Sequence, residues 1–296
     1  MKESFVLIGP AGWNYKDWRG IVYPQRLPKG FQELRYLADF INLIEINSTF
    51  YKIPTLESVK AWLDQVRGQA NFKFSIKLFQ HFTHADYPPA REHTDSFRRI
   101  LDLVQQENRL AALLIQFPWR FKNNPENMDH IFNLAKMFKD FPTAVEFRHD
   151  SWMTKDVFKH LQENHLAFVN IDEPGHDHSL PLSSFVTADF AYLRLHGRNA
   201  DMWFNEKSDA AQRYNYLYNE SEMNSIISSI NDIRDKTGNL YIIFNNHFRG
   251  KAIINAFQMM AKIYSQPPRL PAILVEHAPK LRRIGEIKDN EQLSLF

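Results

Sequence analysis

The chain has 296 residues, enough for one large domain or two small ones, and α/β barrels routinely use this length as a single domain. It contains no cysteine, which excludes disulfides, a thiolate nucleophile and a zinc–thiolate site. Its 36 basic and 34 acidic residues nearly balance, whereas a dedicated nucleic-acid-binding domain is usually more lopsided. No apolar stretch approaches the roughly 20 residues that span a bilayer, and the run Phe5–Ile8 is too short for a signal peptide. We therefore expect a cytoplasmic protein with no membrane partner.

Eight short apolar runs have the pattern of β-strands, and most of them end in polar residues. In chain order they cover 5–9, 43–47, 72–77, 111–116, 144–148, 167–172, 192–196 and 240–246. Between them, apolar residues recur at helical spacing over 34–41, 56–66, 97–104, 124–135, 154–161, 221–233 and 253–260. This alternation predicts a single TIM-like (β/α)8 barrel. A doubly wound open sheet is the alternative, but Gly9–Gly12 matches its glycine-rich phosphate loop poorly.

Local signals refine some of these elements. Pro125 suits the first turn of a helix, and Thr154 and Ser221 are predicted N-caps. The unit after the sixth strand is weak, because Pro174–Leu182 has the composition of a loop and leaves room only for a short helix.

Two segments do not fit the repeating unit. Gly197–Glu220 is a long, aromatic-rich insertion after the seventh strand, and loops of this length often serve as lids or binding loops. The segment from Ala278 onward is polar and charged. We therefore expect a barrel domain over 1–277 and a short C-terminal tail over 278–296.

Polar residues at the carboxyl ends of the strands define the candidate site, because TIM-barrel active sites lie on that face. Residues two apart on a strand share a face, as in the pairs Glu45/Asn47, Ser75/Lys77, Glu146/Arg148 and Arg194/His196. Charged groups aimed into a barrel are costly to bury unless they pair with each other or meet a ligand. An internal ion-pair network, for example Glu45 with Lys77 and Glu146 with Arg148, is one interpretation. The position at the barrel mouth favours the other, a functional site.

The residue types in this cluster suggest particular roles. The predicted catalytic residues are Glu45, Glu146, Lys77 and His196. Either glutamate is a candidate general acid or base, with His196 as the alternative. Lys77 is predicted to hold phosphate or, alternatively, to form a Schiff base. Guanidinium groups bind phosphate and carboxylate, and aromatic rings stack bases. The predicted substrate-binding residues are therefore Trp13, Asn47, Phe50, Tyr51, Gln116, Arg148, Asp172, Arg194, Asn245 and Asn246.

A divalent metal is a weaker alternative, and the cofactor stays open. Residues of types that bind such ions are Glu45, Glu146, Asp172, His196, His247 and Glu276, with His176 and His178 as a further pair. No spacing among them matches a dedicated motif such as His-Glu-x-x-His.

A set of motifs at the strand ends is distinctive in combination. It comprises Gly12-Trp13-x-Tyr15-x-x-Trp18-x-Gly20-x-x-Tyr23-Pro24, Glu45-Ile-Asn-Ser-Thr-Phe-Tyr51, Phe74-Ser-x-Lys77 with Thr83-His84, Gln116-Phe-Pro118, Glu146-Phe-Arg-His149 with Ser151-Trp152, Arg194-x-His-Gly197, and Asn245-Asn246 with Gly250, Ala252 and Asn255-Ala256. Together these motifs resemble the YecE-like family, also called domain of unknown function 72, from about Gly9 to Ala256. The resemblance implies a TIM-like barrel and no established activity. A departure from the family pattern is Pro10-Ala11, where a Thr/Cys-Ser-like pair is expected.

The C-terminal pentapeptide carries a second resemblance. Gln292-Leu293-Ser294-Leu295-Phe296 is similar to the peptide by which bacterial repair and replication proteins dock on the sliding clamp. In such peptides the glutamine bonds at a pocket edge while leucine and phenylalanine fill an apolar pocket. The resemblance implies Gln292, Leu293, Leu295 and Phe296 as partner-binding residues. The alternative is a terminal segment that packs back on the barrel.

Two functional classes stay open at this point. The first is an enzyme, a hydrolase or lyase acting on a phosphate-bearing substrate, with nucleic acid or a nucleotide as the specific expectation and the clamp as recruiter. The second is a clamp-tethered module that binds a ligand or nucleic acid without turning it over. The nearly balanced charge and the lack of a recognised catalytic motif favour the second slightly.

Overall fold

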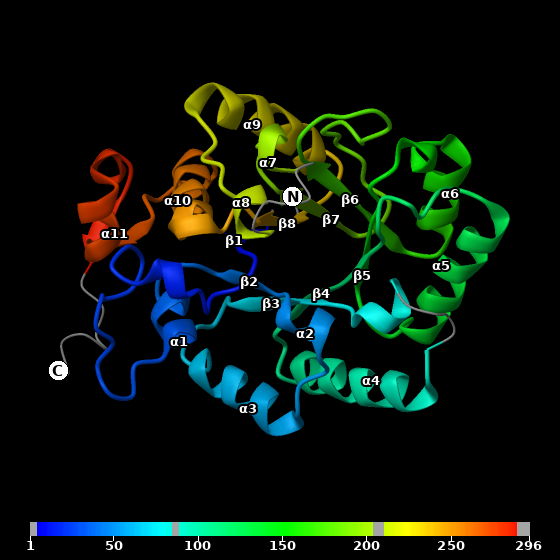
Figure 1. Ribbon diagram of the computed structural model, residues 1–296, viewed down its shortest axis with the longest axis horizontal. Coiled ribbons are helices and arrows are strands. Elements are labelled where there is room, and N and C mark those ends of the chain that lie inside the picture. Colours follow the sequence, from blue (N-terminus) through cyan, green and yellow to red (C-terminus); the bar gives the residue numbers. More distant parts are fainter. Residues whose placement is uncertain (1–4, 85–88, 204–209, 289–296) are drawn as a thin grey trace.

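Eight parallel β-strands form a nearly closed barrel in the computed structural model, which describes residues 5–84, 89–203 and 210–288 (Figure 1). The strands are β1 (Phe5–Pro10), β2 (Leu43–Ile46), β3 (Lys73–Lys77), β4 (Leu110–Gln116), β5 (Thr143–Glu146), β6 (Leu166–Asp172), β7 (Phe190–Leu195) and β8 (Asn239–Phe244). Their order in the sheet is β1-β8-β7-β6-β5-β4-β3-β2, and the paired neighbours are all parallel. The predicted TIM-like barrel is confirmed.

The barrel closes between β1 and β2 without a regular ladder. The N–H of Ile8 donates to Asn42 Oδ1 at 2.9 Å, and the N–H of Gly12 donates to the carbonyl of Glu45 at 2.8 Å. Gly9 lies between these bonds, and a Cβ added there would stand 1.7 Å from the carbonyl oxygen of Leu43. The two strands can therefore approach only because position 9 has no side chain.

Helices surround the barrel on its outer side (Figure 1). Seven of them are α1 (Glu33–Ala38), α3 (Leu56–Gln65), α4 (Arg91–Gln106), α5 (Pro125–Met137), α6 (Lys155–Glu163), α9 (Glu220–Arg234) and α10 (Lys251–Ile263). Each corresponds to a segment with predicted helical periodicity. No helix lies between β6 and β7, where the sequence predicted the weak unit. Within the described ranges, none of the helices has the length and apolar character needed to cross a membrane.

The helix starts follow capping chemistry. Asn124 Oδ1 accepts from the N–H of Asn127 at 2.8 Å ahead of Pro125, and Thr154 Oγ1 accepts from the N–H of Val157 at 3.3 Å. The predicted cap at Ser221 is wrong, because α9 begins after Asn219. Asn219 and Glu222 exchange side-chain-to-backbone hydrogen bonds of 3.0 and 2.9 Å, a reciprocal capping box.

The insertion after β7 folds over the carboxyl end of the barrel. It contains α7 (Ala200–Trp203) and α8 (Ala210–Arg213) before α9 begins. Trp203 lies edge-on to His196, with ring centroids 5.9 Å apart, and Tyr218 donates to Asp172 Oδ2 at 2.6 Å. The described part of the insertion therefore covers the barrel mouth.

The start of the expected C-terminal tail is folded. A 3-10 helix covers Pro279–Arg283, and β10 (Glu286–Lys288) pairs in parallel with β9 (Arg269–Pro271), which precedes α11 (Ala272–His277). Gly285 packs against the backbone of Pro268. The predicted clamp-binding residues Gln292, Leu293, Leu295 and Phe296 lie outside the described residues.

Candidate functional site

Arg194 on β7 is the centre of a buried charge cluster inside the barrel. Its Nη2 lies 2.7 Å from Glu45 Oε1 on β2, and its Nη1 lies 3.1 Å from Glu146 Oε2 on β5. The Arg194 side chain is 2% exposed and both carboxylates are 0% exposed. The Tyr192 hydroxyl donates to Glu45 Oε2 at 2.8 Å and lies 2.8 Å from Ser75 Oγ. Four strands thus meet around one guanidinium group.

Arg148 forms the next layer toward the mouth. Its Nη2 lies 2.5 Å from Glu146 Oε1 and 3.1 Å from His196 Nε2, and its Nη1 pairs with Glu173. The face of Trp203 covers the guanidinium at 5.9 Å. Both arginines are therefore paired with carboxylates, although the buried Nε of Arg148 has no hydrogen-bond partner among the described residues and the side chain keeps 12% exposure.

The charge states in this cluster follow from the pairing. Burial opposes the charge of Glu146, but Arg148 and Arg194 hold the pKa of this carboxyl well below its usual range, so it is ionised at neutral pH. Burial, followed by the same two arginines, lowers the pKa of His196 far below its ordinary value. The His196 ring is accordingly neutral, and its Nδ1 lies 2.9 Å from the Asn245 amide nitrogen.

The predicted ion pair of Glu146 with Arg148 is present, but Glu45 pairs with Arg194 and not with Lys77. The register explains the difference. Glu45 faces Ser75 across the β2–β3 ladder, so Lys77 lies two residues closer to the barrel mouth. The buried cations that were expected to be open for an anion are thus already neutralised from within the protein.

Lys77 differs from these arginines. Its Nζ donates to Gln116 Oε1 at 2.6 Å and lies 4.0 Å above the Phe50 ring. Among the described residues no carboxylate comes within 4.0 Å of this amine. Burial, followed by the charge of Arg194, lowers the pKa of Lys77 to about 7. A large fraction of the amine is therefore unprotonated, and nucleophilic, at neutral pH.

The pKa of His84 reflects the charges at the rim of the barrel mouth beside Lys77. Its ring lies edge-on to Phe50, with centroids 5.0 Å apart, and Arg120 Nη2 donates to its carbonyl at 3.2 Å. Burial, followed by the charges of Lys77, Arg120 and Arg148, lowers the pKa of His84 to about 4. Arg148 is paired with Glu146 and Glu173, so the positive charge at this side of the mouth comes from Arg120 and from the protonated fraction of Lys77.

Other predicted site residues hold the insertion in place. Asp172 forms a 2.7 Å ion pair with Arg198 and accepts from the Tyr218 hydroxyl at 2.6 Å. The Asn246 amide donates to the carbonyl of Tyr216 at 2.9 Å and to Asn255 Oδ1 at 2.8 Å. These bonds fix the chain that crosses the mouth, which is a positioning role.

The remaining predicted substrate-binding residues lie around the rim. Trp13 packs edge-on against Trp62 at 5.7 Å, and the buried Oδ1 of Asn47 has no hydrogen-bond partner in the described segments. Tyr51 is 71% exposed, and Trp119, a residue of the loop after β4 outside the predicted substrate-binding set, is 41% exposed. The two exposed rings are available for stacking on a ligand.

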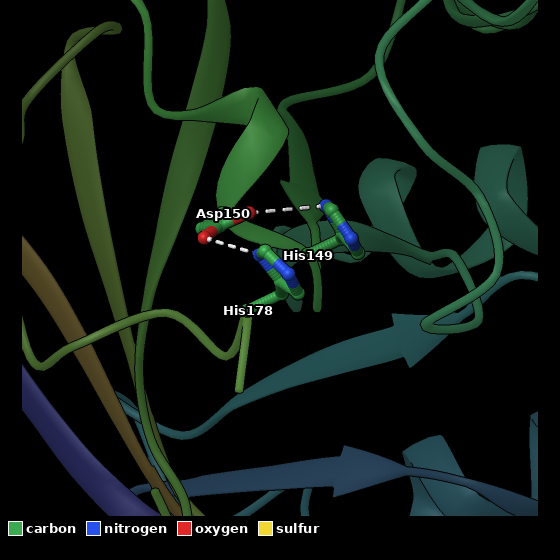
Figure 2. Close-up of side chains that lie close together, drawn as sticks. All are labelled: His149, Asp150 and His178. Carbon is green, nitrogen blue, oxygen red and sulfur yellow. Dashed lines mark hydrogen bonds and ion pairs between the residues drawn. The ribbon is translucent and has the colours of Figure 1, made fainter. Parts of the chain in front are cut away.

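The candidate metal ligands do not gather as one set. His247 stacks on Tyr15 with centroids 4.4 Å apart, and Glu276 is exposed on α11. In the described residues, the group that fits a metal ion consists of His149, Asp150 and His178 (Figure 2). Of these, only His178 was among the candidates from the sequence.

Several site residues were missed by the sequence analysis. Tyr192 shares the inward face with Arg194 and His196 at period two, a signal that was available. Glu173 directly follows Asp172 at a strand end, which was a weaker signal. Arg120 and Arg198 lie in loops, where periodicity says nothing about direction.

Comparison with known proteins agrees with this architecture. The family model described as "Protein of unknown function DUF72" matches residues 7–280. The UPF0759 protein YunF of Bacillus subtilis is 26% identical over 275 residues, covering 86% of this chain and 93% of that protein. The UPF0759 protein YecE of Escherichia coli is 24% identical over 159 residues, which is 51% of each chain.

Solved structures show the same relationship. A DUF72 family protein from Thermotoga maritima is similar with a TM-score of 0.78 and 30% identity, over 87% of this chain and 98% of that one. A DUF72 family protein from Enterococcus faecalis gives a TM-score of 0.75 and 26% identity, over 86% and 94% of the two chains. With a barrel, strand-end motifs and a family match over nearly its whole length, the chain belongs to the DUF72 family of proteins of unknown function.

Proposed function

We propose that the chain is an enzyme that acts at the barrel mouth on a phosphate-bearing substrate, with Lys77 as the reactive amine. The observation that carries this proposal is the setting of Lys77. It lies at the carboxyl end of β3, without a carboxylate partner among the described residues, and its pKa is lowered to about 7. An amine of this kind adds to an aldehyde or ketone, forming a carbinolamine that loses water to give a Schiff base.

The positive rim supports a phosphorylated substrate. Arg194 and Arg148 are engaged by Glu45, Glu146 and Glu173, so these arginines position the site. Phosphate binding is assigned to the rim around His84, where Arg120 adds positive charge, while Lys77 supplies the unprotonated amine.

The aromatic residues narrow the substrate class further. Tyr51 and Trp119 expose rings that suit a nucleobase. A substrate that combines phosphate, a base and an aldehyde is nucleic acid with an abasic site, whose ring-opened sugar is an aldehyde. This class fits lyase chemistry.

The test is trapping of the Schiff base with cyanoborohydride. The full chain is incubated with an abasic oligonucleotide, with intact single-stranded and duplex DNA, and with a small sugar phosphate. Mass spectrometry is expected to locate a reduced adduct on Lys77, and Lys77→Met is expected to abolish it. Lys73→Met is the matched control, because Lys73 lies on the same strand and donates to Asn108 instead. If no carbonyl compound forms an adduct, or if Lys77→Met forms as much as the wild type, the proposal fails.

A clamp-tethered binding module is the second candidate. The closed pairing of Arg148 and Arg194 favours it, because a neutralised cluster has little charge to offer a transition state. The similarity of Gln292–Phe296 to clamp-binding peptides supports tethering to the sliding clamp in either case. A pull-down with purified clamp compares the full chain with one that ends at Asn290. Equal retention of both would remove the tethering proposal, and DNA binding without a steep salt dependence would count against a nucleic-acid ligand.

A further inference from the structure

His149, Asp150 and His178 form a compact group on the same face of the barrel as the candidate site. His149 and Asp150 follow β5, and His178 comes from the loop after β6. Their metal-binding atoms all lie within 4.8 Å of one another. Figure 2 shows the two imidazole rings next to each other, with the Asp150 carboxylate close to one nitrogen of each ring. The Asp150 N–H also donates to the carbonyl of His178 at 2.9 Å, which ties the two loops together.

The carboxylate of Asp150 offers one oxygen to each ring. Oδ1 lies 3.2 Å from His149 Nδ1, and Oδ2 lies 3.1 Å from His178 Nδ1. Spacings of this size are those between neighbouring ligand atoms around an ion with bonds of about 2.0–2.2 Å. A cation placed midway between the two carboxylate oxygens would therefore be within reach of both oxygens and both Nδ1 atoms once the three side chains moved slightly closer together.

The contacts of His149 bring acceptor atoms close together without a positive charge between them. The Ser151 N–H donates to His149 Nδ1 at 3.1 Å and Ser151 Oγ lies 2.9 Å from the same nitrogen, so in the neutral ring the proton is on Nε2 and Nδ1 carries a lone pair that a metal ion would take over from Ser151. The same nitrogen also lies 3.2 Å from Asp150 Oδ1, so two acceptor atoms are in close contact. The His149 side chain is only 7% exposed, and its buried Nε2 has no hydrogen-bond partner within the described ranges. A cation between the acceptors would relieve the contact and keep this tautomer.

We propose that His149, Asp150 and His178 bind a divalent first-row transition metal ion, with zinc as the reference ion. Two imidazole nitrogens and a carboxylate suit such ions, whereas magnesium and calcium prefer oxygen ligands alone. The side chains of Asp150 and His178 are 44% and 62% exposed, which leaves coordination positions open to solvent or to an anionic ligand. The site is independent of Lys77 chemistry and goes beyond the proposed function.

The test is titration of the metal-stripped full chain with zinc chloride by calorimetry, with cobalt(II) absorption as a spectroscopic check of coordination. One zinc ion per chain is expected. His178→Asn removes the imidazole but tolerates the left-handed backbone at this position, where φ is +64°. Asp150→Asn removes the charge at constant size. Each variant is expected to weaken zinc binding at least about tenfold.

His160→Asn is the matched control, because His160 and Glu163 form an exposed histidine–carboxylate pair of 3.5 Å on α6 with no third ligand among the described residues. It is expected to bind zinc like the wild type. Thermal melting without metal checks that every variant is folded. The proposal is overturned if the wild type binds no zinc and no cobalt, or if His178→Asn and Asp150→Asn bind as tightly as His160→Asn.

Discussion

Replacement of Arg194 by methionine tests whether the buried charge cluster contributes to the stability of the barrel. Arg194→Met leaves Glu45 without a paired cation among the described residues, while Glu146 retains Arg148. Both carboxylates are 0% exposed, so water cannot take over the role of the guanidinium. Removing one partner of a buried ion pair costs about 3–5 kcal/mol of unfolding free energy. We expect a loss of unfolding free energy of that size, mainly because the Glu45 carboxylate stays buried without its cation.

The assay is urea unfolding at pH 7, followed by a double-mutant cycle. Glu45→Gln in the Arg194→Met background removes the unpaired charge, so it should restore part of the lost stability and make the two changes non-additive. Arg67→Met is the control, because Arg67 is 80% exposed in its pair with Asp64, and it should cost less than about 1 kcal/mol. A loss below about 1 kcal/mol for Arg194→Met, or strict additivity in the cycle, would show that the cluster is not energetically coupled.

Two further predictions concern Lys77 and the barrel seam. Because the pKa of Lys77 falls from its ordinary 10.5 to about 7 on folding, the unfolded chain binds more protons between these values, and stability rises with pH across this window. From pH 7 to pH 9, urea unfolding of the wild type should gain on the order of 2 kcal/mol that Lys77→Met lacks; parallel pH profiles would contradict the lowered pKa. Gly9→Ala should destabilise by about 1–3 kcal/mol or more in the same assay, because its Cβ meets the carbonyl oxygen of Leu43. Gly68→Ala, with nothing within 4 Å, should be neutral or slightly stabilising, and equal effects of the two changes would refute the reasoning about the seam.

The sequence was sufficient to predict the helices and strands and to place the polar residues near the carboxyl ends of the strands. Strand periodicity assigns Glu45, Glu146 and Arg194 to inward faces, and helical periodicity places the surrounding helices. Capping was read correctly at Thr154 and incorrectly at Ser221. Residues of the same capping class lie two positions apart at the start of α9, and only the reciprocal bonds of Asn219 with Glu222 decide between them.

The partners within the site could not be read from the sequence. Pairing depends on register and on which strands face each other across the barrel, and neither is a local property. Arg194 on β7 reaches Glu45 on β2 across the interior, although the two are 149 residues apart. His149 and His178 likewise meet only because two loops after neighbouring strands converge. Loop directions of this kind are set by tertiary contacts.

The buried charges and the reactive amine are coupled, and the coupling has a sign that can be measured. Burial lowers the pKa of Lys77 most, Arg194 lowers it further, and Glu146 and Glu45 raise it. Arg194→Met should therefore raise the pKa of Lys77, and Glu146→Gln should lower it below that of the wild type. NMR titration of reductively methylated protein, with Lys77→Met to assign the signal, measures both shifts. If the buried ion pairs served only the stability of the barrel, the pKa of Lys77 would stay unchanged or shift in the same direction in both variants. Opposite shifts would mean that these ion pairs set the nucleophilicity of the Lys77 amine.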